Sequence, residues 1–309
     1  MSVALANREL LATLAVSDSD ELVSVLTWAS DTTSRAWSMT RDGRLQALAC
    51  WRPLPWDSEV LQLPSGSIGG LWATGEYVEQ CSNLDAVLKA CIADAKRHSI
   101  RFLSLRLEEN ALAALHAAEG AGFRVIESFL TFRRPTTEES PSDVGFALEP
   151  TIALYVRRTR PADMETVADL AFRTFQFFRL FADPRIPEER ARHTRQEWVR
   201  NGFKGRADAM YVAESSNRLA GFALLQLKIG ANGEKVGVIE LIAVAAEFSG
   251  RGIGKALVAQ SIRHYQGKAS EIEVGTQGKN TRAVGLYIRM GFRLVRSEFS
   301  LHRHTDSST

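Results

Sequence analysis

The stretch that decides the fold is V-I-E-L-I-A-V-A-A-E-F-S-G-R-G-I-G-K, which runs from Val238 to Lys255. Residues 238–244 are apolar apart from Glu240, a pattern typical of a strand that is buried on both faces. From Ile253 onward the apolar residues follow helical spacing. The turn between strand and helix contains three glycines, which can adopt positive φ angles: Gly250, Gly252 and Gly254. Free N–H groups at such a helix start form an anion site, and a diphosphate is its usual occupant.

Two well-known phosphate-binding motifs do not fit this turn. The dinucleotide-binding fingerprint has the spacing G-x-G-x-x-G, and the phosphate-binding loop of NTPases has Ser or Thr after its Lys. Here the spacing is G-x-G-x-G, and Ala256 follows Lys255. The alternative to an anion site is a glycine-rich turn that only packs a helix against a sheet.

A second strand and a second helix follow. Residues 271–276 alternate between apolar and polar or small side chains, which predicts a strand. Asn280 is a good N-cap for a helix that continues through Met290 and ends at Gly291. Tyr287 lies about two turns after Asn280, so both side chains project from the same side of this helix.

This order of a strand, G-R-G-I-G, a helix, a strand and N-x-x-A-x-x-L-Y-x-x-x-G-F resembles the GNAT superfamily of acetyl-CoA-dependent N-acyltransferases. The resemblance implies that the strand ending near Val244 and the strand starting near Glu271 separate, with the pantetheine arm of the cofactor in the gap. One position departs from the family pattern. The family usually has Gln or Arg three residues before the middle glycine, and this chain has Ser249 there.

The same resemblance implies binding roles. Backbone groups of Val244, Ala245 and Ala246 would pair with the pantetheine arm. Asn280 would contact the arm beside the thioester, and Tyr287 would line the same site. N–H groups of the glycine turn and the first helical turn would hold the diphosphate: Arg251, Gly252, Ile253, Gly254, Lys255 and Ala256.

Transfer of an acetyl group to an amine needs a base and an acid. Tyr287 is the candidate acid, because a phenol is protonated at neutral pH and can supply a proton to a thiolate. Glu240 is a candidate base, because it is the acidic residue of a buried strand and burial raises a carboxyl pKa toward neutrality. The alternative for Glu240 is a structural carboxylate held by hydrogen bonds, and Glu127 is a rival base.

The N-terminal half repeats the C-terminal pattern without its chemistry. G-F-R-V-I-E-S-F-L-T-F-R-R starts at Gly122 and G-F-R-L-V-R-S-E-F-S-L-H-R starts at Gly291, an offset of 291 − 122 = 169 residues. At this offset Ala118 stands in the place of Tyr287, and residues 81–83 stand in the place of the glycine turn. We therefore expect an N-terminal copy that kept the scaffold and lost the cofactor site.

The predicted fold class is α/β (α+β), with two GNAT-like units that each have a mixed, mostly antiparallel central sheet flanked by helices. The predicted domains are a degenerate GNAT-like domain at 1–134 and a catalytic acetyltransferase domain at 151–309. Residues 135–150 between them are rich in Pro, Ser, Thr and Glu and predict a linker.

A weaker resemblance concerns the acceptor. T-Q-x-x-N-x-x-A-x-x-x-Y from Thr276 to Tyr287, the aromatic-arginine pair at 178–179 and the Trp-Asp corner at 56–57 are similar to the TDP-fucosamine N-acetyltransferase (WecD-like) group. Those enzymes acetylate the 4-amine of a nucleotide-linked 4-amino-4,6-dideoxy sugar. The group has a glutamate after the N-terminal G-F, which is Glu127 here.

Two further clusters have open interpretations. The phenylalanines at 172–181 fit a packed core or an apolar wall of an acceptor pocket. The arginines interleaved with glutamates at 185–206 fit a solvated helix face or a clamp for a phosphorylated acceptor.

The composition limits the function classes. The chain has 309 residues, 45% of them hydrophobic and 24% charged, as in soluble globular proteins. A net charge of +2 argues against nucleic acid as a partner. Three cysteines without a C-x-x-C pair argue against a metal site, and the absence of an apolar run of about 18 residues argues against a membrane partner. We expect a cytoplasmic protein, and the sequence leaves a homodimer open.

The resulting hypothesis is an acetyl-CoA-dependent N-acetyltransferase that acts on a primary amine of a small molecule, with a nucleotide-linked amino sugar as a candidate. The amine would attack directly, with a tyrosine as general acid. The alternatives are an N-acetyltransferase for a protein or peptide amine and a non-catalytic acetyl-CoA-binding module.

Overall fold

The chain divides into two compact units, Met1–Glu127 with Glu298–Thr309 and Ser128–Ser297. The structure is a computed structural model, and it describes residues 2–6, 28, 31–137, 154–216, 218–230 and 233–305. The predicted linker at 135–150 lies outside the described residues from position 138 onward.

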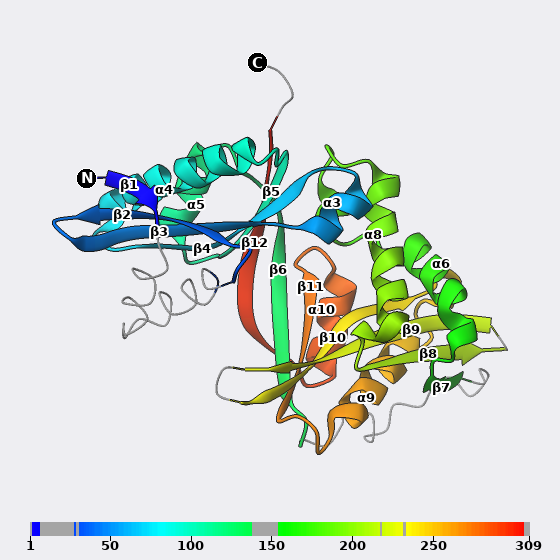
Figure 1. Cartoon of the computed structure of the whole chain (residues 1–309). Helices are drawn as coiled ribbons and strands as arrows, with labels where there is room; N and C mark the ends of the chain where they lie inside the picture. Colours follow the sequence, from blue (N-terminus) through cyan, green and yellow to red (C-terminus); the bar gives the residue numbers. More distant parts are fainter. Residues whose placement is uncertain are drawn as a thin grey trace. The chain divides into compact units, whose positions relative to one another are not determined.

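The sheet of the first unit has the strand order β1-β2-β3-β4-β5-β12 (Figure 1). Only β4 and β5 are parallel, and the other neighbours are antiparallel. The strands are β1 Ser2–Leu5, β2 Arg35–Arg41, β3 Arg44–Pro53, β4 Ser65–Ala73, β5 Phe102–Glu108 and β12 Arg293–His304, of which residues 298–304 pair with β5.

The described part of this unit includes the helices α3 Pro55–Leu61, α4 Tyr77–Arg97 and α5 Leu112–Gly120. Buried side chains recur every three or four residues along α4, as in Leu84, Leu88 and Cys91, and form one face of the helix. This face packs with α5 and with Trp51 of β3 in one hydrophobic core.

The sheet of the second unit has the strand order β6-β11-β10-β9-β8-β7. Here β10 and β11 are the parallel pair, and the other neighbours are antiparallel. The strands are β6 Arg124–Pro135, β7 Leu154–Arg158, β8 Ala209–Ser215, β9 Arg218–Ile229, β10 Lys235–Val244 and β11 Glu271–Gln277.

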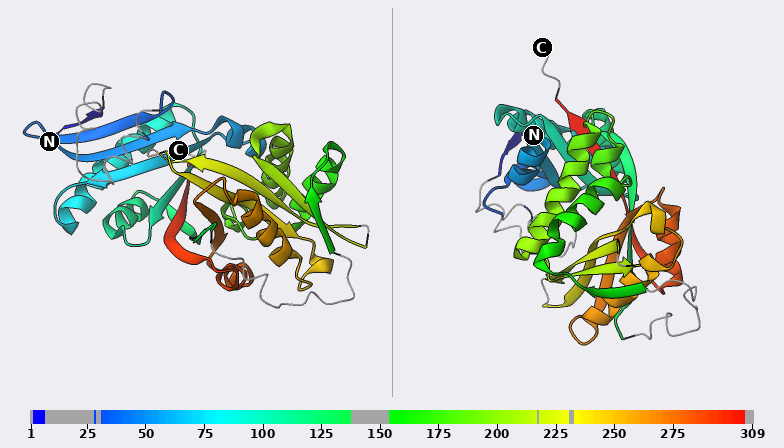
Figure 2. Two further views of the ribbon diagram at one scale, coloured as in Figure 1. Left: turned by 90° about the horizontal axis from the view of Figure 1, so that it is seen from below. Right: turned by 90° about the vertical axis from the view of Figure 1, so that its right-hand side faces the viewer.

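Helices cover both faces of this second sheet (Figure 1, Figure 2). Met210 of β8 lies against Gly202 at the end of α8, while the next residue, Tyr211, contacts His264 of α9. Successive strand residues point to opposite faces, so α8 and α9 lie on opposite sides of the sheet. The helices are α6 Met164–Thr174, α7 Arg179–Ala182, α8 Glu188–Asn201, α9 Ile253–Tyr265 and α10 Thr281–Arg289, with short helical turns at Pro161–Asp163, Gly202–Arg206 and Ala246–Phe248. No helix in the described part of the chain is long and apolar enough to cross a membrane.

The two units repeat one arrangement, which confirms the predicted duplication. In each, a helix connects two parallel strands: β4-α4-β5 in the first unit and β10-α9-β11 in the second. The parallel pairing is short in both. It joins Ser65–Ile68 to Phe102–Leu105 in one and Val236–Ile239 to Glu271–Val274 in the other.

The last strand of each half belongs to the other compact unit. Residues 129–135 of β6 pair with β11, and residues 298–304 of β12 pair with β5. The compact units therefore differ from the predicted halves 1–134 and 151–309 at these strands. Hydrophobic alternation predicts that a segment is a strand but does not specify its neighbour, so the sequence could not reveal the exchange.

The correspondence expected between residues 81–83 and the glycine turn was wrong. Helix α4 begins at Tyr77, so residues 81–83 lie inside it, and the turn before the helix is Thr74–Glu76. Helix α4 has 21 residues and α9 has 13, so the offset of 169 taken from the later strands does not hold at the helix starts.

Candidate active site

The glycine turn begins helix α9 in a conformation that side chains other than glycine rarely adopt. Gly250 has φ 82° and Gly252 has φ 79°. A Cβ atom at Gly250 would meet no atom within 4 Å, so space beside the turn is open. The first N–H groups of a helix have no partner inside it and carry partial positive charge. The turn therefore fits an anion such as a diphosphate. Among the predicted binding residues, the N–H of Ala256 already donates to the Gly252 carbonyl at 3.0 Å.

Strands β10 and β11 separate, as expected, before β10 leads into this turn. Their pairing ends at Ile239 and Val274. Beyond that point β10 pairs only with β9 and β11 only with β6. After the separation, the backbone groups on the facing edges of β10 and β11 do not pair with each other.

Part of the predicted backbone contact region is already engaged. The N–H of Ala245 donates to Ala220 at 2.9 Å, and its carbonyl accepts from Phe248 at 2.9 Å. The carbonyl of Ala246 accepts from Ser249 at 3.1 Å. Val244 pairs with Gly221 in the ladder with β9. These bonds fix the course of the chain from the end of β10 into the glycine turn.

Helix α10 lies against the first turn of α9. The Asn280 side chain caps α10 by accepting from the Ala283 N–H at 3.3 Å, and it donates to Thr276 of β11 at 3.1 Å. A Cβ at Gly254 would lie 3.3 Å from a methyl group of Leu286. The cap confirms the predicted helix start, and this contact brings α10 to the glycine turn.

Tyr287 on α10 is an almost completely buried phenol with 2% of its surface exposed. Its ring packs against Phe132 and Phe292, with centroid distances of 5.9 Å to each. Burial raises the pKa of Tyr287 well above the ordinary value of a phenol. Its hydroxyl forms no hydrogen bond with a described residue. The phenol is therefore a protonated group whose hydroxyl can interact with a ligand.

Glu240 lies at a β-bulge, since the register between β9 and β10 shifts between Ile239 and Leu241. Its Oε1 accepts a hydrogen bond from the guanidinium of Arg206, and its Oε2 is buried without a partner among the described residues. Arg206 ends the π-helical turn Gly202–Arg206. Bulges and π-helical turns often mark functional sites. The sequence left Glu240 open as a base or as a structural carboxylate held by hydrogen bonds, and the structure pairs it with Arg206.

Glu127 is the rival base. It is buried on β6 and is the last residue of the first unit before Ser128. The glycine turn, Asn280, Tyr287 and Glu240 all belong to the second unit. The structure brings those four features together within one unit, and the role of Glu127 stays a proposal.

An aromatic-cation cluster on α8 extends from the Glu240 ion pair. The Arg206 guanidinium lies 4.7 Å from the Trp198 ring centroid, and the Arg195 guanidinium lies 5.2 Å from the same ring. Arg195 also lies 4.4 Å from the ring of Phe178, which is 1% exposed. Trp198 was not among the residues predicted from the sequence, although its i,i+3 spacing from Arg195 on a predicted helix could have indicated the contact.

Most of the α8 arginines whose contacts are described bind carboxylates. Arg192 pairs with Glu188 at 2.7 Å, and Arg200 pairs with Glu165 at 2.6 Å. Because these cations are neutralised by neighbouring acids, the structure favours an ion-paired helix surface over a phosphate clamp at these positions.

The helix start in the first unit does not offer the same anion site. Gly75 precedes α4 with φ 100°, and a Cβ there would lie 2.5 Å from the carboxylate of Glu79. Arg41 holds the other Glu79 oxygen at 3.4 Å. A carboxylate of the protein thus lies where an anionic ligand would bind.

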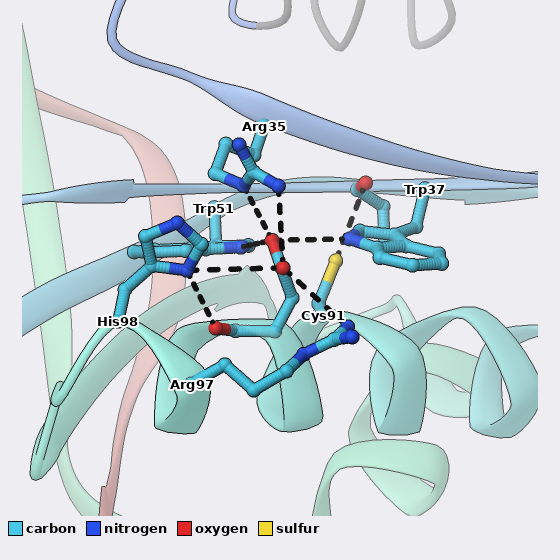
Figure 3. Close-up of polar contacts among 8 residues, drawn as sticks. Arg35, Trp37, Trp51, Cys91, Arg97 and His98 are labelled. Carbon is cyan, nitrogen blue, oxygen red and sulfur yellow. Dashed lines mark hydrogen bonds and ion pairs between the residues drawn. The ribbon is translucent and has the colours of Figure 1, made fainter. Parts of the chain in front are cut away.

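The first unit instead contains a buried carboxylate on the sheet-facing side of α4 (Figure 3). Asp94 is 3% exposed and accepts hydrogen bonds from Arg35 at 2.5 Å, Trp51 at 3.0 Å and Trp37 at 3.4 Å. Burial alone raises the pKa of Asp94, but these donors outweigh burial and hold the pKa below its usual value. Since both oxygens are engaged, the cluster joins α4 to β2 and β3 as a structural element.

Residues 166–292 match the model of the acetyltransferase (GNAT) family. The chain contains a GNAT acetyltransferase domain. The match includes Glu240, the glycine turn, Asn280 and Tyr287. Similarity to a relative extends beyond the GNAT domain. The spore coat polysaccharide biosynthesis protein SpsD of Bacillus subtilis (strain 168) is 27% identical over 263 residues, which cover 84% of this chain and 85% of that protein.

Solved structures share the fold over the whole chain. A GCN5-related N-acetyltransferase from Sphaerobacter thermophilus covers 98% of this chain and 95% of its own, with a TM-score of 0.65 and 16% identity. A tandem GNAT protein from the clavulanic acid biosynthesis pathway covers 100% of this chain and 99% of its own, with a TM-score of 0.60 and 14% identity. These likenesses confirm the prediction of two GNAT units in one chain.

Proposed function

We propose that this protein transfers an acetyl group from acetyl-CoA to a primary amine of a small molecule, and that the acceptor is an amino sugar carried on a nucleotide. The observation that carries the proposal is the separation of β10 from β11 in a GNAT domain, where β10 then leads into the glycine turn. The turn would provide N–H groups for a diphosphate, and the separated strand edges would hold an extended arm.

The amino-sugar acceptor rests on the relative. SpsD is named for the biosynthesis of a polysaccharide, and its similarity covers most of both chains. Amino sugars are common building blocks of such polymers. The resemblance of Thr276–Tyr287 to enzymes that acetylate nucleotide-linked amino sugars supports the same class.

The chemistry divides between two side chains. Bound acetyl-CoA supplies an acetyl thioester that an amine nitrogen attacks, and coenzyme A leaves as the free thiol. Tyr287 would donate its phenolic proton to the departing sulfur, a role that suits a phenol kept protonated by burial. Glu240 would accept the proton that the attacking nitrogen loses, and the proton would return to the phenolate through solvent. The Arg206 ion pair would orient its carboxylate.

Calorimetry with acetyl-CoA and then thiol release with a panel of amines test this function. The panel includes TDP-linked 4-amino sugars, free amino sugars and lysine-containing peptides, and mass spectrometry identifies the acetylated product. We expect binding at one site per chain and thiol release with the sugar nucleotides. Thiol release only with peptides would contradict an amino-sugar acceptor and favour a protein or peptide amine as the acceptor. Binding without release on any amine would favour a non-catalytic acetyl-CoA-binding module.

A further inference from the structure

A side chain from helix α10 reaches the glycine turn of α9. Arg282, the second residue of α10, donates a hydrogen bond from Nη1 to the hydroxyl of Ser249 at 2.5 Å. Ser249 directly precedes Gly250, and the two partners are 33 residues apart in the chain. The contact holds a guanidinium group beside the open part of the turn.

Arg282 has no carboxylate partner among the described residues, and neither has Arg251 of the turn itself. Arg251 only lies 5.7 Å from the ring centroid of Phe248. Arg218 lies 5.2 Å from the same ring but pairs with Glu247 at 3.0 Å. A guanidinium has five N–H donors, and Ser249 uses one of those of Arg282. Unpaired cations thus gather at the turn, in contrast to the ion-paired arginines of α8.

The position of Arg282 in its own helix argues for a role outside it. A cation in the first turn of a helix is unfavourable, because the helix start already carries partial positive charge. A residue that violates a local rule often serves a functional site. A bound phosphate near the glycine turn would supply the missing negative charge.

We propose that Arg282 is a side-chain ligand for a phosphate of coenzyme A, and that Ser249 orients it. Because the proposal rests on the proposed function, it identifies a cofactor-binding residue of that same site. Ser249 carries no positive charge and cannot pair with a phosphate as a cation would. In this proposal Arg282 of α10 supplies that charged side chain at the turn instead. The forked guanidinium suits phosphate oxygens, with which it forms charge-assisted hydrogen bonds.

Calorimetric binding of coenzyme A and of pantetheine, which lacks phosphates, tests the proposal without turnover. We expect Arg282→Gln to weaken coenzyme A binding at least about tenfold and to leave pantetheine binding unchanged. The matched control is Arg289→Gln, which removes the same charge about two turns, roughly 10 Å, along the same exposed side of α10. It should leave both affinities unchanged.

Two further arms sharpen the result. If Arg282→Gln weakens the binding of 3′-dephospho-coenzyme A as much as that of coenzyme A, Arg282 contacts the diphosphate. If only the binding of coenzyme A is weakened, Arg282 contacts the 3′-phosphate. Ser249→Ala should weaken binding in the wild-type background and have no further effect in Arg282→Gln. The inference would be overturned if Arg282→Gln bound coenzyme A as tightly as wild type does, or if its affinity for pantetheine fell as much as its affinity for coenzyme A. Failure of the wild type to bind coenzyme A would overturn the proposed function and, with it, this inference.

Discussion

The ring of Tyr265 on α9 covers Gly237 of β10 so closely that a Cβ at Gly237 would lie 2.2 Å from Cδ2 of the ring. The Tyr265 side chain is fully buried, and its hydroxyl donates to the carbonyl of Gln226 at 2.6 Å. Packing and this hydrogen bond hold the ring in place. The contact fixes how α9, and with it the glycine turn, sits on the sheet.

Gly237→Ala should therefore destabilise the protein by about 1–3 kcal/mol, the usual cost of overpacking a core. Urea unfolding followed by tryptophan fluorescence measures the effect. Gly120→Ala is the matched control, because a Cβ there would meet no atom within 4 Å and Gly120 has no positive φ. Equal unfolding midpoints for both variants would contradict the tight contact.

Asp94 provides a prediction about pH. Its pKa in the folded protein is lowered, so its charge contributes stability that is complete above the unfolded pKa of about 4 and is lost as the pH falls through the folded value. Asp94→Asn should destabilise the protein by on the order of 2 kcal/mol at pH 7, because a charged acceptor of several hydrogen bonds is lost. The difference from wild type should shrink below pH 4. Thermal unfolding at several pH values checks this, and a difference that stays constant down to pH 2 would refute it.

The parts of the site that the sequence predicted have local causes. The Asn280 cap, the end of α10 shortly before Gly291 and the turn before α9 each depend on residues a few positions apart. Short-range signals of this kind specify helix ends without knowledge of the fold. The resemblance to a known family then indicated that β10 and β11 separate.

The parts that the sequence did not predict depend on distant partners. Arg206 and Glu240 are 34 residues apart, and Arg282 and Ser249 are 33 apart. The pattern of buried residues gives the face of a strand, but the side chain that meets it comes from another element. For that reason the sequence indicated neither Arg206 as the partner of Glu240 nor the contact of Arg282 with the glycine turn.

Tyr287→Phe should slow turnover by about 10²- to 10⁴-fold, the usual contribution of a positioned acid. Coenzyme A binding should change little, because the ring contacts with Phe132 and Phe292 remain. Since burial raises the pKa of the phenol, wild-type turnover should not fall as the pH rises toward about 9. Steady-state kinetics and calorimetry check both points. Turnover close to that of wild type would remove Tyr287 from the mechanism.

Glu240→Gln, compared with Arg206→Gln, separates a catalytic carboxylate from a structural ion pair. Both variants break the pair, but only the first removes the carboxylate. If Glu240 is the base, Glu240→Gln should lower kcat by about 10²-fold or more, and Arg206→Gln should lower it by less than about tenfold because the base remains. Equal losses would mean that the pair only holds the bulge of β10 against the π-helical turn. Glu127→Gln belongs in the same series, since a large loss there with normal turnover in Glu240→Gln would make Glu127 the base.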